Sequence, residues 1–143
     1  MNSKLNVLLS NLVVCYHKLQ NFHWYIAGET FFQAHAKLEE FYNGVLPQVD
    51  DIAEMILMNG GKPVASLEEF KSLATIKEAS DDFQNDFKHV LSTVEADFET
   101  LLNSAKDIKA DADKEENYLV STKMDDLIAN YAKAIWMIKQ FSK

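Results

Sequence analysis

Apolar side chains recur along most of the chain at intervals of three, four and seven residues, which is the period of amphipathic helices. The first such stretch runs from residue 3 to about residue 27 and ends before Gly28. The second begins after Thr30, a candidate cap, and ends at Asn59-Gly60-Gly61. Two series in it repeat by sevens: Phe31, Leu38, Val45 and Ile52, and His35, Tyr42, Val49 and Ile56. This double seam indicates a long helix packed in a bundle.

The second helix contains Pro47, which lacks an N–H and therefore predicts a kink or bulge. Ser66 and Glu69 have capping-box spacing and precede a helix of one or two turns in the connection that follows.

The second half of the chain predicts two further long helices. The apolar series of the first starts at Phe83 and ends at Ile108, and the other extends to about Phe141. The charged stretch 109–117 between them is expected to be a turn or a frayed helix start. The order long, long, short, long, long predicts an all-α, ferritin-like four-helix bundle in one domain, residues 1–143, with the short helix in the crossover.

The net charge of the chain limits the kinds of molecule that it can bind. The formal net charge is −8, and all 14 basic residues are lysines. Nucleic-acid binding depends on basic side chains at phosphates, and arginine also supplies bidentate base contacts. We therefore expect no direct DNA binding, while the acidic surface favours cations such as Fe²⁺. The lone Cys15 allows no internal disulfide, and no apolar stretch approaches the ~20 residues of a membrane span. The first stretch is expected to be a helix of a mature cytoplasmic protein rather than a signal sequence.

The candidate chemistry consists of two groups of side chains. Glu54 follows Asp50, and Glu39 follows His35, by four residues, so each pair shares a helix face. His23 lies near the end of the first helix. His35 and Asp50 are fifteen residues apart on one helix, roughly 22 Å at 1.5 Å per residue, so they cannot bind one metal ion together. A two-fold axis that pairs this helix antiparallel with a second copy removes the difficulty, because histidine from one subunit then meets carboxylates from the other.

A structural interpretation of the same residues stays open at this point. Histidines on an apolar stripe are commonly hydrogen-bonded core residues, and carboxylates at i and i+4 commonly form a solvated face. The Glu-x-x-His motif of di-iron bundles is absent, and its nearest counterpart, Asp86-Phe87-Lys88-His89, is expected to be surface.

Several motifs together resemble the Dps family of mini-ferritins. The densest match lies within residues 21–79. It comprises Asn21-Phe22-His23-Trp24-Tyr25, Gly28, Phe31-Phe32, His35, Tyr42, Val49-Asp50-Asp51-Ile52-Ala53-Glu54, Gly60-Gly61-Lys62-Pro63 and Ser66-Leu67-Glu68-Glu69, with Ala134-Ile135-Trp136-Met137 in the closing helix.

The resemblance implies a hollow, bacterial, cytoplasmic dodecamer with iron sites at its two-fold interfaces. His23 and His35 of one subunit, with Glu39 as an additional acidic ligand, would face Asp50 and Glu54 of the partner. Such proteins oxidise Fe²⁺, preferably with hydrogen peroxide, store the ferric mineral and so protect DNA. For this chain hydrogen peroxide and dioxygen both stay open as the oxidant. Two alternatives are a DNA-condensing nucleoid protein, which the charge argues against, and a structural shell with vestigial metal sites.

Two departures from the family pattern concern charge. Met55 replaces the arginine usual after Glu54, and Asn117-Tyr118-Leu119-Val120 replaces an acidic start of the last helix. Acidic residues at that start commonly line the pores through which iron enters, so the route of iron in this chain stays open.

Overall fold

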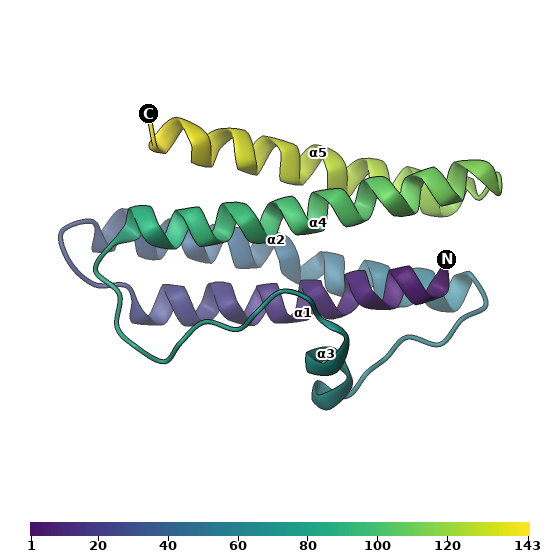
Figure 1. Ribbon diagram of the computed structural model, residues 1–143, viewed down its shortest axis with the longest axis horizontal. Coiled ribbons are helices and arrows are strands. Elements are labelled where there is room, and N and C mark those ends of the chain that lie inside the picture. Colours follow the sequence, from purple (N-terminus) through teal and green to yellow (C-terminus); the bar gives the residue numbers. More distant parts are fainter.

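The computed structural model describes all 143 residues and contains five helices. They are α1 (Asn2–Tyr25), α2 (Phe31–Met58), α3 (Leu67–Leu73), α4 (Phe87–Lys114) and α5 (Tyr118–Phe141). The long helices form two antiparallel pairs, α1 with α2 and α4 with α5, which pack into one bundle (Figure 1). The connection from α2 to α4 runs back along the bundle and carries α3, as Figure 1 shows. The predicted ferritin-like four-helix bundle is confirmed.

The core is continuous and consists of side chains from all four long helices. It contains 30 buried apolar residues, with Phe98 and several leucines and isoleucines fully enclosed. Their burial explains the period of the sequence pattern, because each long helix places one apolar stripe inside the bundle. None of the helices is long and apolar enough to cross a membrane.

The crossover is held against α1 by asparagine side chains that interrupt the apolar stripe of that helix. The carboxamide oxygen of Asn11 accepts hydrogen bonds from the backbone N–H groups of Thr75 and Ile76, at 2.8 and 3.0 Å. Asn6 accepts a hydrogen bond from the Val64 N–H and donates one to the Lys62 carbonyl, and Asn21 donates one to the Ser80 carbonyl. An irregular segment cannot satisfy its own backbone groups, so these asparagines determine where it lies.

Two boundaries differ from the sequence prediction. The third long helix starts at Phe87 rather than near Phe83, because Asp86 caps it by accepting a hydrogen bond from the backbone N–H of His89 (3.1 Å). It also continues to Lys114, so residues 109–114 are helical rather than a turn. Ala112 continues the buried stripe within this charged stretch, and the chain reverses only at Glu116, which has a left-handed φ of 56°.

The predicted short helix in the crossover is confirmed as α3 (Leu67–Leu73). Ser66 caps it by accepting a hydrogen bond from the Glu69 backbone N–H (3.2 Å), and the Ser66 hydroxyl donates to the Glu69 carboxylate (2.9 Å). Thr30 occupies the cap position of α2 but makes no side-chain capping bond. Helix α2 continues through Pro47, which is exposed, from Phe31 to Met58. The kink or bulge at this proline stays a prediction.

Candidate functional site

His23 and His35 meet where α1 turns back into α2. His23 lies in the last turn of α1 and His35 in the second turn of α2. Gly28 between them has a φ of +102°, which other residues rarely adopt, and this permits the tight reversal. The two imidazole rings stack with centroids 3.6 Å apart and an interplanar angle of 15°. The turn therefore brings together two of the predicted ligands, which are twelve residues apart in sequence.

Reciprocal hydrogen bonds determine which ring nitrogens are available. Nδ1 of His23 lies 2.7 Å from the backbone oxygen of His35, and Nδ1 of His35 lies 2.8 Å from the backbone oxygen of His23. A carbonyl oxygen can only accept, so both Nδ1 atoms carry the hydrogen and donate. In the neutral rings both Nε2 atoms then carry the lone pair, which is the form of histidine that binds a metal ion.

Aromatic neighbours restrict the rotation of both rings. His35 also stacks on Phe31, with centroids 4.8 Å apart, and His23 packs against the edge of Tyr42 at 5.3 Å and 80°. His23 is only 5% exposed. The imidazoles are thus preorganised and have little side-chain entropy left to lose when they bind an ion.

Glu39 is the carboxylate nearest to the histidines. Its Oε1 atom lies 3.8 Å from Nε2 of His23, and the hydroxyl of Tyr42 donates a hydrogen bond to the same oxygen at 3.4 Å. Partial desolvation and then the Glu39 charge raise the pKa of Tyr42, so the phenol stays protonated and remains a donor. The side chain of Glu39 is 54% exposed, so its carboxylate faces both the histidines and solvent.

Asp50 and Glu54 form a second, separate group on α2. Both are exposed, and the pKa of Glu54 is raised because its carboxyl lies within hydrogen-bonding range of Asp50 and feels its charge. The fifteen helical residues from His35 to Asp50 span roughly 22 Å. Within one chain no three histidine, cysteine or acidic side chains are grouped to hold a metal ion. The structure therefore places Glu39 beside the stacked pair of His23 and His35 without grouping the three around one ion position, and Asp50 and Glu54 lie apart from them.

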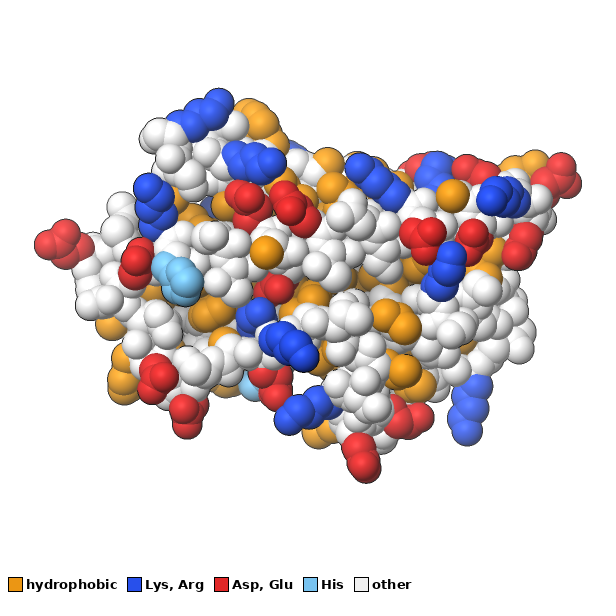
Figure 2. Space-filling model, in the orientation of Figure 1, with side chains coloured by type: hydrophobic (Ala, Val, Ile, Leu, Met, Phe, Trp, Pro, Cys, Tyr) orange, Lys and Arg blue, Asp and Glu red, His pale blue; other side chains and the backbone are white.

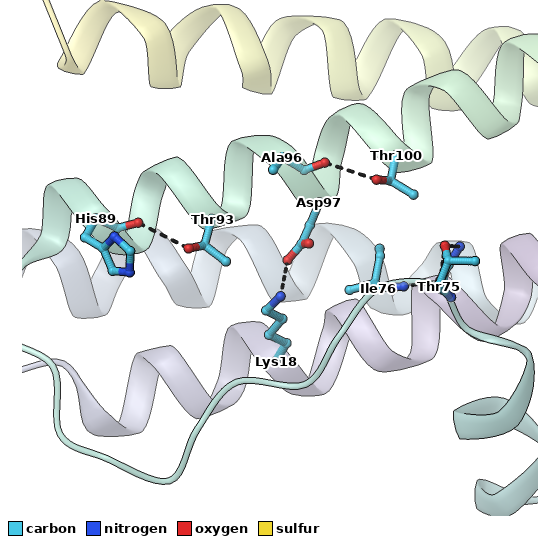
Figure 3. Close-up of polar contacts among 9 residues, drawn as sticks. Lys18, Thr75, Ile76, His89, Thr93, Ala96, Asp97 and Thr100 are labelled. Atoms are coloured by element: carbon cyan, nitrogen blue, oxygen red, sulfur yellow. Dashed lines mark hydrogen bonds and ion pairs between the residues drawn. The ribbon is translucent and has the colours of Figure 1, made fainter.

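The interior of the bundle offers no alternative di-iron site. Its buried polar residues include no carboxylate, and the nearest acid, Asp97 on α4, forms a 2.8 Å ion pair with Lys18 of α1 (Figure 3). The two side chains are 13% and 7% exposed. Di-iron sites inside such bundles need inward-facing glutamates from several helices. The buried polar residues of the bundle therefore do not form a carboxylate site of this kind.

Sequence reasoning found the histidines and acids but missed two of these features. Tyr42 appeared in the heptad series and in the motif that resembles the Dps family but was given no role at the site, although its spacing of three residues from Glu39 places both on one side of α2. The Lys18–Asp97 pair had no local signal, because its partners are distant in sequence. His89 is exposed, as expected, and His17 is exposed as well.

Comparison with known proteins agrees with this architecture. The family described as "Ferritin-like domain" matches residues 2–143, which makes the chain a ferritin-like protein. A protein of Brevibacillus brevis named "DNA protection during starvation protein" is 35% identical over 137 residues, covering 96% of this chain and 91% of the relative.

Solved structures give the same result. A Dps protein from Vibrio cholerae, described as a member of a broad superfamily of ferritin-like diiron-carboxylate proteins, has a TM-score of 0.95 and 32% identity. The match covers 99% of this chain and 88% of the Vibrio cholerae chain. Antigen TpF1 from Treponema pallidum has a TM-score of 0.96 and 32% identity, covering 99% and 90%. The chain belongs to the Dps family.

Proposed function

We propose that this protein oxidises Fe²⁺ with hydrogen peroxide at sites shared between two subunits and stores the product as ferric mineral inside a hollow dodecamer. His23 and His35 bind the iron through Nε2, with Glu39 beside them, and Asp50 and Glu54 of the partner subunit complete the site. Removal of iron and peroxide together limits hydroxyl-radical formation and thereby protects DNA.

The observation that carries this proposal is the orientation of the two imidazoles. Both Nδ1 atoms are committed to backbone carbonyls, which leaves both Nε2 atoms as acceptors. Histidines that served only to fill the core would not need their rings stacked at 3.6 Å beside an exposed carboxylate. Imidazole combined with carboxylate is also a ligand mixture that suits iron.

The incompleteness of the site within one chain supports an assembly. Asp50 lies roughly 22 Å along α2 from His35 of its own subunit, but an antiparallel pairing of two α2 helices would bring each acidic group to the partner's histidines and form two equivalent sites. Leu57 and Met58, one turn beyond Glu54, are 60% and 63% exposed. Such apolar side chains at the surface favour contact with another protein surface.

The reaction balances without another cofactor. Two ferrous ions each give one electron to one hydrogen peroxide molecule, whose O–O bond breaks. With two water molecules the products are two units of ferric oxyhydroxide and four protons. Since the oxidant takes both electrons, no hydroxyl radical is released. The role of the chain is to hold the ions beside each other and to surround them with carboxylate side chains.

The surface argues against DNA condensation. Figure 2 shows lysines scattered among acidic side chains on the visible face rather than gathered in one patch. Seven of the lysines are also paired with carboxylates in the structure: Lys4, Lys18, Lys37, Lys71, Lys109, Lys123 and Lys139. We expect no retardation of plasmid DNA at physiological salt, and stoichiometric retardation would contradict the proposal that protection is chemical.

Anaerobic titration with Fe²⁺ followed by addition of peroxide tests the function. The protein should saturate at one or two ions per site and then oxidise them rapidly. A His35→Ala/Asp50→Ala variant should lose the rapid phase while its assembly, measured by gel filtration, stays intact. A variant that oxidises iron as fast as the parent would show that the site lies elsewhere, and an assembled parent without any rapid phase would indicate a shell with vestigial sites.

A further inference from the structure

Tyr42 contacts both a histidine and the carboxylate of the candidate site. The edge of its ring packs against His23, with centroids 5.3 Å apart and an angle of 80°. Its hydroxyl donates to Oε1 of Glu39 at 3.4 Å, and the same oxygen lies 3.8 Å from Nε2 of His23. One side chain therefore joins the two kinds of ligand within a single subunit.

The position of Tyr42 is itself determined by α1. Its ring packs edge-to-face on Tyr16, with centroids 5.6 Å apart and an angle of 87°. The hydroxyl of Tyr16 in turn accepts a hydrogen bond from Nε2 of Gln20 at 3.2 Å. Phe31, His35, His23, Tyr42 and Tyr16 thus form a continuous series of ring contacts. Packing, rather than the bond to Glu39, determines the direction of the phenol.

A phenol in this place has a specific effect on the carboxylate. Glu39 is half exposed, and an exposed glutamate samples many rotamers that it must give up when it binds an ion. A hydrogen bond from a fixed donor reduces this entropy loss. The donor is neutral, so it orients the carboxylate without competing with a cation as a lysine would, and it leaves Oε2 of Glu39 without a partner in its own chain.

We propose that Tyr42 is a positioning residue that orients Glu39 and His23 for the incoming divalent ion and so sets the affinity of the histidine side of the site. This inference rests on the proposed function. It assigns to Tyr42 an effect on binding of the ion rather than on electron transfer, since the phenol contacts the two side chains that hold the ion.

Co²⁺ is a suitable probe because it stays divalent in solutions without peroxide. Its d–d absorption also reports the number and type of its ligands. Removal of an outer hydrogen-bonding partner typically weakens metal binding by 10–100-fold, and the exposure of Glu39 places this case near the lower end. We expect Tyr42→Phe to weaken Co²⁺ binding about tenfold in calorimetry. The d–d spectrum should shift, and KM for Fe²⁺ should rise by a similar factor with kcat nearly unchanged.

Two controls separate orientation from general destabilisation. Tyr25→Phe removes another tyrosine hydroxyl near the end of α1, where Phe83 is the aromatic ring that the tyrosine contacts, and should leave Co²⁺ binding unchanged. In a double-mutant cycle, Tyr42→Phe should have little further effect once Glu39→Ala has removed the carboxylate on which it acts.

The outcomes are distinct. Equal Co²⁺ affinity, spectrum and KM in Tyr42→Phe and the parent would overturn the inference. So would a Tyr42→Phe effect that persists undiminished in the Glu39→Ala background. If the His35→Ala/Asp50→Ala variant bound Co²⁺ as tightly as the parent, the proposed site itself would be wrong, whatever the effect of Tyr42→Phe.

Discussion

Mixing two inactive variants tests whether each iron site is shared between subunits. His35→Ala removes a ligand from the histidine side, and Asp50→Ala removes one from the acidic side. Because the two positions lie roughly 22 Å apart along α2, a substitution at one leaves the other side intact. An assembly of either variant alone has every site damaged and should lose rapid Fe²⁺ oxidation.

A mixed assembly should recover a defined share of the activity. When equal amounts of the two subunits combine at random, half of the two-fold interfaces pair unlike subunits. In each of these, one site receives both damaged sides and the other site receives the intact histidines of one subunit and the intact acids of its partner. About one quarter of all sites are then complete, so the rapid phase should return to about 25% of the parent amplitude.

The assay uses co-expressed subunits with two different affinity tags, purified in sequence so that every assembly contains both kinds. The amplitude of the rapid phase after addition of peroxide is compared with that of the parent at equal protein concentration. A matched control mixes His35→Ala with His23→Ala, which damage the same side and should show no recovery. If the first mixture were as inactive as this control, the ligands would not be divided between subunits in the proposed way.

Three further predictions concern the stability of the helix bundle and the burial of its core. Lys18→Met should lower the free energy of unfolding by about 3–5 kcal/mol in urea denaturation, because it leaves the Asp97 carboxylate buried without its partner, and adding Asp97→Leu should restore most of this loss. Asn117→Ala should cost about 1 kcal/mol or more, measured in the same way, because Asn117 caps α5 at the Val120 N–H and also donates to Asn59. Burial raises the pKa of the Cys15 thiol far above its ordinary value, so the thiol should not react with a disulfide reagent or peroxide until the protein unfolds. A Cys15 that reacts in the native protein would contradict the burial.

The helices and the candidate ligands could be predicted because their signals are local. Heptad spacing on α2 reflects one buried stripe, and His35, Glu39, Asp50 and Glu54 are related by helical geometry alone. The ends of α4 were harder to predict from the sequence. The stretch 109–114 is helical and largely solvated, but its charged composition resembles that of a turn. Its end depends on the reversal at Glu116, which no apolar pattern marks.

Other features arise from contacts between residues distant in sequence. Asn6 and Asn11 appear in the sequence only as interruptions of an apolar stripe, yet they hold the crossover by accepting bonds from its backbone. The stacking of His23 on His35, with both Nδ1 atoms bound to carbonyls, likewise depends on how the turn at Gly28 closes.

The sequence by itself determined the period, length and order of the helices, the sign of the surface charge and the types of ligand available, since each of these is a property of neighbouring residues. Only the tertiary structure decided that both Nδ1 atoms donate to backbone carbonyls, which leaves Nε2 as the available nitrogen of each imidazole, and that Tyr42 contacts both Glu39 and His23. The physical reason is that ring orientation and ligand convergence depend on packing between helices, and helical periodicity restrains each helix only about its own axis.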